Sequence, residues 1–148
     1  GLERYEVSAY ALAGKTSRHN LNYWEFGDYL GIGAGAHGKV TLPDSNSIWR
    51  TRKVRQPNHY LARTLSRLAE KSRLEVNELP VEFLLNALRL RHGFAQALFE
   101  RRTGLPFSTI GKRVEYLGTQ GLLAISHDHV KPTDRGYELL NSVLEEFV

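Results

Sequence analysis

A histidine followed closely by two aromatic residues is the part of the sequence best suited to chemistry. His19 precedes Tyr23 and Trp24 within a polar stretch that is rich in turn-forming residues. An imidazole nitrogen ligates transition metals and heme iron, and aromatic rings pack against a flat macrocycle. His19 is therefore one candidate for a metal or heme ligand. A simpler interpretation, which chemistry alone favours, is a loop histidine with local hydrogen bonds beside two aromatic residues that anchor the loop.

A glycine-rich segment is the second candidate. Gly31, Gly33 and Gly35 alternate with other residues, and Ala36 and His37 follow them. Glycines at this spacing let a backbone approach a ligand closely or expose its amides to an anion. The match to the dinucleotide fingerprint G-x-G-x-x-G is loose, because Ala36 stands at its sixth position. Tight backbone packing in a crowded sheet is the alternative interpretation.

The rest of the chain offers no catalytic pattern. The other histidines lack the spacing of metal ligands, and no nucleophile-elbow motif is evident. The chain has no cysteine, which excludes disulfides, thiolate-held zinc and cysteine-ligated iron–sulfur clusters within it. It also has no methionine, even at position 1, so we expect a fragment or a processed product of a longer protein.

Length and composition favour a globular protein. The 148 residues are enough for one domain or two small ones, and 41% of them are hydrophobic. No run approaches the roughly 18–20 apolar residues of a membrane helix, and the polar start has no signal-peptide pattern. We therefore expect a soluble, cytoplasmic protein without a membrane span.

The positive charge is concentrated in one stretch. The net charge is +4, but residues 50–73 hold eight basic residues against one acidic residue. Such a stretch attracts phosphates, carboxylates or polyanions. The alternative is a solvated linker and helix face, which is the more ordinary role of a charged run.

The first half of the chain predicts a few short strands. We expect strands at residues 4–10 and 29–33, a polar loop over 13–28, a hairpin of 39–42 and 47–52, and a helix that follows residues 57–59 and reaches about residue 70. A set of elements this small rarely forms a stable domain by itself. We therefore interpret it as the last piece of a larger sheet or barrel, whose exposed strand edges favour self-association.

The second half predicts helices and one small hairpin. Helices are expected at residues 80–90, 94–102 and 108–120, followed by a hairpin of 122–125 and 129–132 and a last helix capped by Thr133. This is the order of a winged-helix domain, which raises a DNA-binding regulator as an alternative function. The third helix offers only Lys112 and Arg113 against Glu115. That is meagre for binding phosphates and reading bases, so nucleic acid is not an expected partner.

Several segments together resemble one family. Residues 4–8, 18–24 and 28–37 are similar to the late part of the radical-SAM domain of the oxygen-independent coproporphyrinogen oxidase-like family, and residues 82–90 and 122–136 resemble its C-terminal domain. The resemblance implies an α+β fold. Residues 1–74 would be the last strands of a partial β/α barrel with a basic linker helix, and residues 75–148 a helical, winged-helix-like domain.

The resemblance also implies a function. A His-Asn-x-x-Tyr-Trp sequence is typical of the heme-chaperone branch of this family, which implies that His19 ligates heme iron and that Tyr23 and Trp24 support the macrocycle. The expected partners are heme or a porphyrin and the proteins that accept heme. The segment from Gly31 to His37 resembles a strand end that lines the S-adenosylmethionine pocket.

The family's cysteine motif is the main departure. Radical chemistry on S-adenosylmethionine needs a [4Fe–4S] cluster, and this chain has no cysteine to hold one in the family's manner. We therefore expect cluster and S-adenosylmethionine only in a full-length parent, and no turnover by this chain alone.

Overall fold

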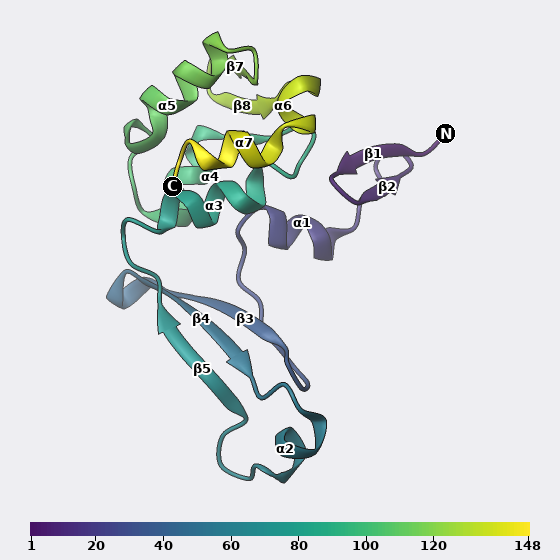
Figure 1. Cartoon of the computed structure of the whole chain (residues 1–148), viewed down its shortest axis with the longest axis vertical. Helices are drawn as coiled ribbons and strands as arrows, with labels where there is room; N and C mark the ends of the chain where they lie inside the picture. The colour runs from purple at the N-terminus through teal and green to yellow at the C-terminus, as the bar shows by residue number, and fades with distance from the viewer. The chain divides into compact units, whose positions relative to one another are not determined.

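The computed structural model describes residues 1–148, which form two compact units (Figure 1). The first unit combines residues 1–26 with residues 77–148, and the second consists of residues 27–76. The mixture of helices and antiparallel strands confirms the α+β class. None of the helices is long and apolar enough to cross a membrane. The division into functional domains at residues 74 and 75 stays a prediction.

The first unit begins with a small hairpin. Strands β1 (Glu3–Glu6) and β2 (Ala9–Ala11) pair antiparallel, so the prediction of one strand over residues 4–10 is wrong. The chain reverses at Val7 and Ser8. The Arg4 guanidinium donates to the Val7 carbonyl, and the Ser8 hydroxyl donates to the Glu6 carboxylate at 2.9 Å. These side-chain hydrogen bonds stabilise a turn, which the alternation of residue types in this segment does not indicate.

A helix, α1 (Arg18–Trp24), occupies the segment that was predicted to be a polar loop. Ser17 caps it, because its hydroxyl oxygen accepts a hydrogen bond from the Asn20 amide at 3.3 Å. Serine and asparagine are turn formers, but serine is also among the best N-cap residues. The prediction of a polar loop over residues 13–28 is therefore wrong for residues 18–24, which form this helix.

The remainder of the first unit follows the predicted order of helices and hairpin, but the helix predicted from residue 94 begins at Gln96, and residues 94–95 form an additional strand. Its elements are α3 (Leu79–Ala87), β6 (Phe94–Ala95), α4 (Gln96–Thr103), α5 (Ser108–Thr119), β7 (Leu123–Ser126), β8 (His129–Pro132), α6 (Asp134–Glu138) and α7 (Leu140–Glu145). The three strands form an antiparallel sheet in the order β6-β8-β7. Thr133 caps α6 by accepting from the Gly136 amide at 3.0 Å. The predicted last helix is interrupted at Leu139, where the backbone leaves the helical region.

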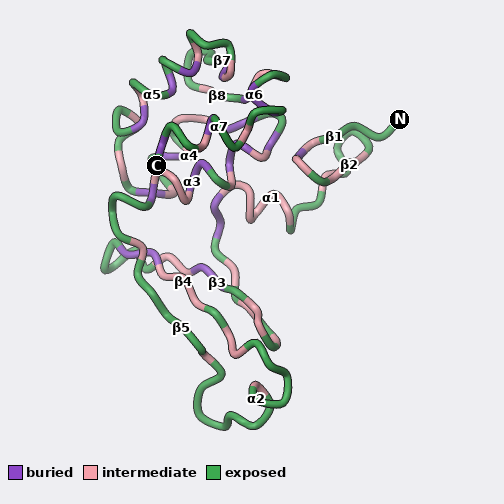
Figure 2. Tube along the Cα trace, in the orientation of Figure 1, coloured by how far each residue is buried: buried purple, intermediate pink, exposed green.

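A cluster of phenylalanines lies in the core of the first unit, whose buried segments are purple in Figure 2. Phe83 on α3 is fully buried, and its ring centroid lies 5.9, 5.0 and 5.2 Å from those of Phe26, Phe94 and Phe99, all edge to face. Burying one large apolar side chain stabilises a fold by roughly 1.5–3 kcal/mol. Phe26 follows α1 closely, so the cluster also attaches α1 to the rest of the unit.

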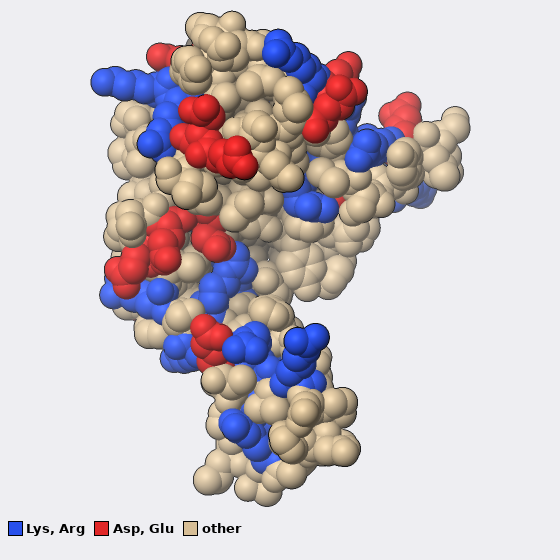
Figure 3. All heavy atoms as spheres, viewed as in Figure 1, with Lys and Arg blue, Asp and Glu red and all other residues tan.

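The second unit is built on a three-stranded antiparallel sheet. Strands β3 (His37–Leu42) and β4 (Ser47–Lys53) form the predicted hairpin, closed by the 3-10 turn η1 (Pro43–Ser45). Strand β5 (Leu68–Arg73) pairs with β4, which gives the order β3-β4-β5. Lys and Arg side chains gather over β4, β5 and the segment around α2 (Pro57–Ala62), as Figure 3 shows.

Two predictions for the second unit are wrong. Residues 29–33 do not form a buried strand: Tyr29 makes a single bridge to Lys39, while Leu30 and Ile32 are 79% and 89% exposed. The helix expected to reach about residue 70 ends at Ala62, and the charged residues beyond it form β5. The strand has low intrinsic propensity and forms by pairing along β4, where Glu70 also meets Arg52 at 3.0 Å.

Candidate functional site

Helix α1 presents an imidazole and a phenol side by side. His19 and Tyr23 lie one helical turn apart, and their ring centroids are 4.7 Å apart in an edge-to-face arrangement. The His19 side chain is exposed to solvent, and Tyr23 is half-buried. An exposed imidazole can reach a ligand without rearrangement of the fold, and the adjacent ring offers an apolar surface to it.

The other two side chains of the His-Asn-x-x-Tyr-Trp sequence hold the helix in place. The side-chain amide of Asn20 donates a hydrogen bond to the Tyr5 hydroxyl at 3.1 Å, and this bond joins α1 to β1. The Trp24 indole lies beneath the guanidinium of Arg89, whose central carbon is 4.3 Å from the ring centroid. The motif therefore divides into an outward pair, His19 and Tyr23, and an anchoring pair, Asn20 and Trp24.

The five residues predicted to line a cofactor pocket lie together in the second unit. The amides of Gly33, Gly35 and Ala36 donate to the Tyr60 hydroxyl, the Val54 carbonyl and the Gly33 carbonyl. His37 begins β3 and pairs with Arg52. Because these amides already have partners within the protein, they are not free for an anion.

Close backbone packing accounts for the glycine at position 31. A Cβ atom there would overlap the carbonyl of His37, so glycine is required whether or not a ligand binds. The chain has no cysteine, and therefore the residues present do not fit an iron–sulfur cluster of the family type.

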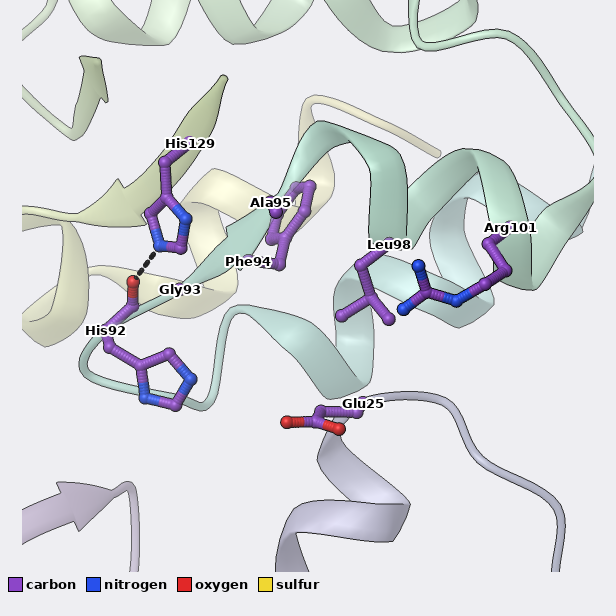
Figure 4. Close-up of a pocket in the computed structure, with 8 residues that line it drawn as sticks. All are labelled: Glu25, His92, Gly93, Phe94, Ala95, Leu98, Arg101 and His129. Atoms are coloured by element: carbon purple, nitrogen blue, oxygen red, sulfur yellow. Dashed lines mark hydrogen bonds between the residues drawn. The ribbon is translucent and has the colours of Figure 1, made fainter. Parts of the chain in front are cut away.

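A small cavity opens in the first unit beyond the end of α1 (Figure 4). Its volume is about 240 Å³, and Glu25, His92, Leu98 and Arg101 surround it. The His129 ring and the His92 carbonyl form a hydrogen bond of 2.5 Å at its edge. The chain contains no group of three or more His, Cys, Asp or Glu side chains arranged to hold a metal ion.

The His92 ring has a lowered pKa. Its partial burial is the main cause, the nearby His129 ring acts in the same direction, and the Glu25 carboxylate opposes them. The lowered pKa favours the neutral form of this ring at neutral pH. Residue types alone gave no signal for this arrangement, since positions 25, 92 and 129 are far apart in the sequence.

Acidification is expected to destabilise the first unit through His92. Since the pKa is lower in the folded chain than its ordinary value of 6.5, the unfolded chain takes up the proton first, and stability falls as the pH drops below that value. A His92→Gln variant should lose less stability than the wild type between about pH 7 and about pH 5. Urea unfolding at both pH values measures this, and equal losses in the two proteins would refute the assignment.

Comparison with known proteins places these features in a family context. Residues 74–139 match the family model of the HemN C-terminal domain. The whole chain aligns with the heme chaperone HemW of Escherichia coli (strain K12) at 42% identity and with that of Haemophilus influenzae at 39%. The chain spans 38% of the length of each of these relatives.

A solved structure supports the fold. The chain is similar to coproporphyrinogen III oxidase (HemN) from Escherichia coli, a radical SAM enzyme, with a TM-score of 0.63 over 99% of this chain and 37% of that one. The sequence identity is 14%, so this likeness concerns the fold alone. These comparisons give the DNA-binding alternative no support.

Proposed function

Because the chain belongs to the oxygen-independent coproporphyrinogen oxidase-like family and is related along its whole length to HemW heme chaperones, we propose that it is the part of a heme chaperone that contacts heme and carries the C-terminal domain. Heme, or a related porphyrin, is its cargo, and heme-accepting proteins are its partners. The S-adenosylmethionine and [4Fe–4S] chemistry of the family belongs to a full-length parent.

The exposed His19–Tyr23 pair is the observation that carries this proposal. A neutral imidazole nitrogen ligates heme iron, and the Tyr23 ring, 4.7 Å away, packs against the macrocycle. Trp24 contributes indirectly, because its contact with the Arg89 guanidinium anchors α1. A ligand at the surface suits a carrier, since cargo bound there can pass to an acceptor without unfolding of the chaperone.

Replacement of His19 by alanine is expected to weaken hemin binding by about tenfold or more, which corresponds to about 1.4 kcal/mol or more. The loss follows from removal of the nitrogen that ligates the iron. Titration of the 148-residue chain with hemin, followed by the Soret band, measures the affinity.

A matched control is available in the same unit. His127 is exposed in the turn between β7 and β8, so His127→Ala removes an exposed imidazole at a distant position and should bind hemin like the wild type. Equal affinities for wild type and His19→Ala would disprove ligation by His19. A wild-type chain that binds no hemin would remove the proposed function of this chain.

We also propose finer features of the architecture. The order of α3, α4, α5, the β7–β8 hairpin and α6 is that of a winged-helix-like domain over residues 75–148, and residues 1–74 would complete the end of a partial β/α barrel. Unpaired strand edges in such an end favour self-association. A cytoplasmic location is part of the same proposal.

A further inference from the structure

An ion pair between a half-buried arginine, Arg89, and a buried carboxylate, that of Glu6, joins β1 to the turn after α3. Glu6 is 1% exposed, and its Oε2 atom lies 3.5 Å from a terminal nitrogen of the Arg89 guanidinium. The Ser8 hydroxyl donates to the other carboxylate oxygen at 2.9 Å. A charge this deeply buried is stable only beside an opposite charge. Glu6 therefore determines where the Arg89 guanidinium lies.

The backbone on both sides of this pair is fixed as well. Leu90 bridges Glu6, and the Arg91 amide donates to the Tyr5 carbonyl at 3.0 Å. The Tyr137 hydroxyl donates to the carbonyl of Arg89 at 2.8 Å. Both the side chain and the main chain of Arg89 are thus held by groups from β1 and α6.

The Arg89 guanidinium also contacts α1, so α1 is held by the same group of residues. It stacks over the Trp24 ring, with 4.3 Å between its central carbon and the ring centroid. Three buried atoms of the cluster, Trp24 Nε1, Arg89 Nε and Glu6 Oε2, have no hydrogen-bond partner. Buried polar atoms are normally hydrogen-bonded. The cluster is therefore held by charge pairing and stacking, which depend on the planar guanidinium.

We propose that Arg89, held by Glu6, is a positioning residue for the heme ligand. Arg89 fixes the Trp24 indole, and since Trp24 is the last residue of α1, it fixes the orientation in which α1 presents His19 and Tyr23. Neither Glu6 nor Arg89 touches heme in this proposal. The inference rests on the proposed function, and it assigns to the segment that matches the HemN C-terminal domain the control of a ligand that lies outside it.

Two variants separate positioning from general stability. Arg89→Lys keeps the positive charge near Glu6 but lacks the planar group that stacks on Trp24. The double variant Glu6→Leu/Arg89→Met replaces the ion pair with apolar side chains, which often preserves or raises stability. Arg113→Lys, at an exposed position of α5, is the matched control. All are made in a Trp49→Phe background, so that Trp24 is the only tryptophan.

Two readouts are taken for each variant. Acrylamide quenching of Trp24 fluorescence without hemin reports the exposure of the indole, and the Soret titration reports hemin affinity. We expect Arg89→Lys and the double variant to expose Trp24 and to bind hemin about tenfold more weakly. Losses of this size are typical when a residue that orients a metal ligand is replaced. The double variant should do so while its unfolding midpoint stays close to that of the parent.

Either of two results would overturn the proposal that Arg89 positions the heme ligand. Parental quenching and parental hemin affinity in the double variant would show that the pair serves stability alone, and the proposal would be overturned. Parental behaviour of Arg89→Lys would overturn it too. If the parent itself binds no hemin, the proposed function fails, and the quenching of Trp24 alone then decides whether Arg89 positions the indole.

Discussion

Replacing Phe83 with alanine is expected to lower the free energy of unfolding of the first unit by about 3–5 kcal/mol. Phe83 is fully buried and meets the rings of Phe26, Phe94 and Phe99 edge to face. Truncation removes the transfer free energy of a large side chain and leaves a cavity that neighbouring rings fill only partly. Because the total stability of a domain is about 5–15 kcal/mol, this single change approaches the limit of folding.

Urea unfolding followed by Trp24 fluorescence measures the effect on the first unit, again in a Trp49→Phe background. Phe83→Leu is the matched control, because it keeps an apolar side chain and leaves a smaller cavity, and its loss should be clearly smaller. Hemin binding should weaken along with the fold in Phe83→Ala, since Phe26 attaches the end of α1 to this cluster. An unfolding midpoint like that of the wild type would show that Phe83 is not central to the core.

Replacing Asp28 with alanine is expected to destabilise the second unit by about 2–4 kcal/mol. Its carboxylate lies 2.8 Å from the ammonium of Lys39, which is 1% exposed, and accepts hydrogen bonds from the amide and hydroxyl of Thr41 at 2.8 Å. Loss of this carboxylate removes a close opposite charge from an ammonium that is buried. The cost lies below that of a fully buried pair because Asp28 is 42% exposed.

The Asp28–Lys39 pair also makes the stability of the second unit depend on pH. Partial burial alone would raise the pKa of Asp28, but the hydrogen bonds from Lys39 and Thr41 outweigh it and hold the pKa below its usual value. The contribution to stability is therefore complete above about pH 4 and is lost as the pH falls through the lowered pKa. Asp28→Ala should lack this acid-sensitive part.

Trp49 fluorescence in a Trp24→Phe background reports unfolding of the second unit. Asp44→Ala is the matched control, because Asp44 is an exposed carboxylate in the turn of the same sheet, and its loss should change stability very little. A midpoint for Asp28→Ala equal to that of Asp44→Ala would contradict the importance of the buried pair.

The elements that the sequence predicted well have strong local signals. The β3–β4 hairpin surrounds a turn cluster that begins with Pro43, and α3 and α5 carry apolar residues at helical spacing between clear start and stop residues. The failures occur where local and tertiary signals conflict. Ser17 acts as a helix cap rather than a turn residue, and β5 forms by pairing with β4, which lies at least 15 residues earlier in the sequence.

The candidate site shows the same contrast. The spacing of His19 and Tyr23, four residues apart, becomes meaningful once α1 is known to be a helix, because such residues share one face. The supports of the site were not predictable in this way. Glu6, Trp24 and Arg89 meet only in the folded chain, and no spacing in the sequence links them.

The ligand of the iron is the most direct test of the heme-carrier account. Resonance Raman spectra of the ferrous heme complex detect an iron–histidine stretching band when an imidazole ligates the iron. Wild type and His127→Ala should show this band, and His19→Ala should lack it. An unchanged band in His19→Ala would contradict the assignment of the heme ligand to α1.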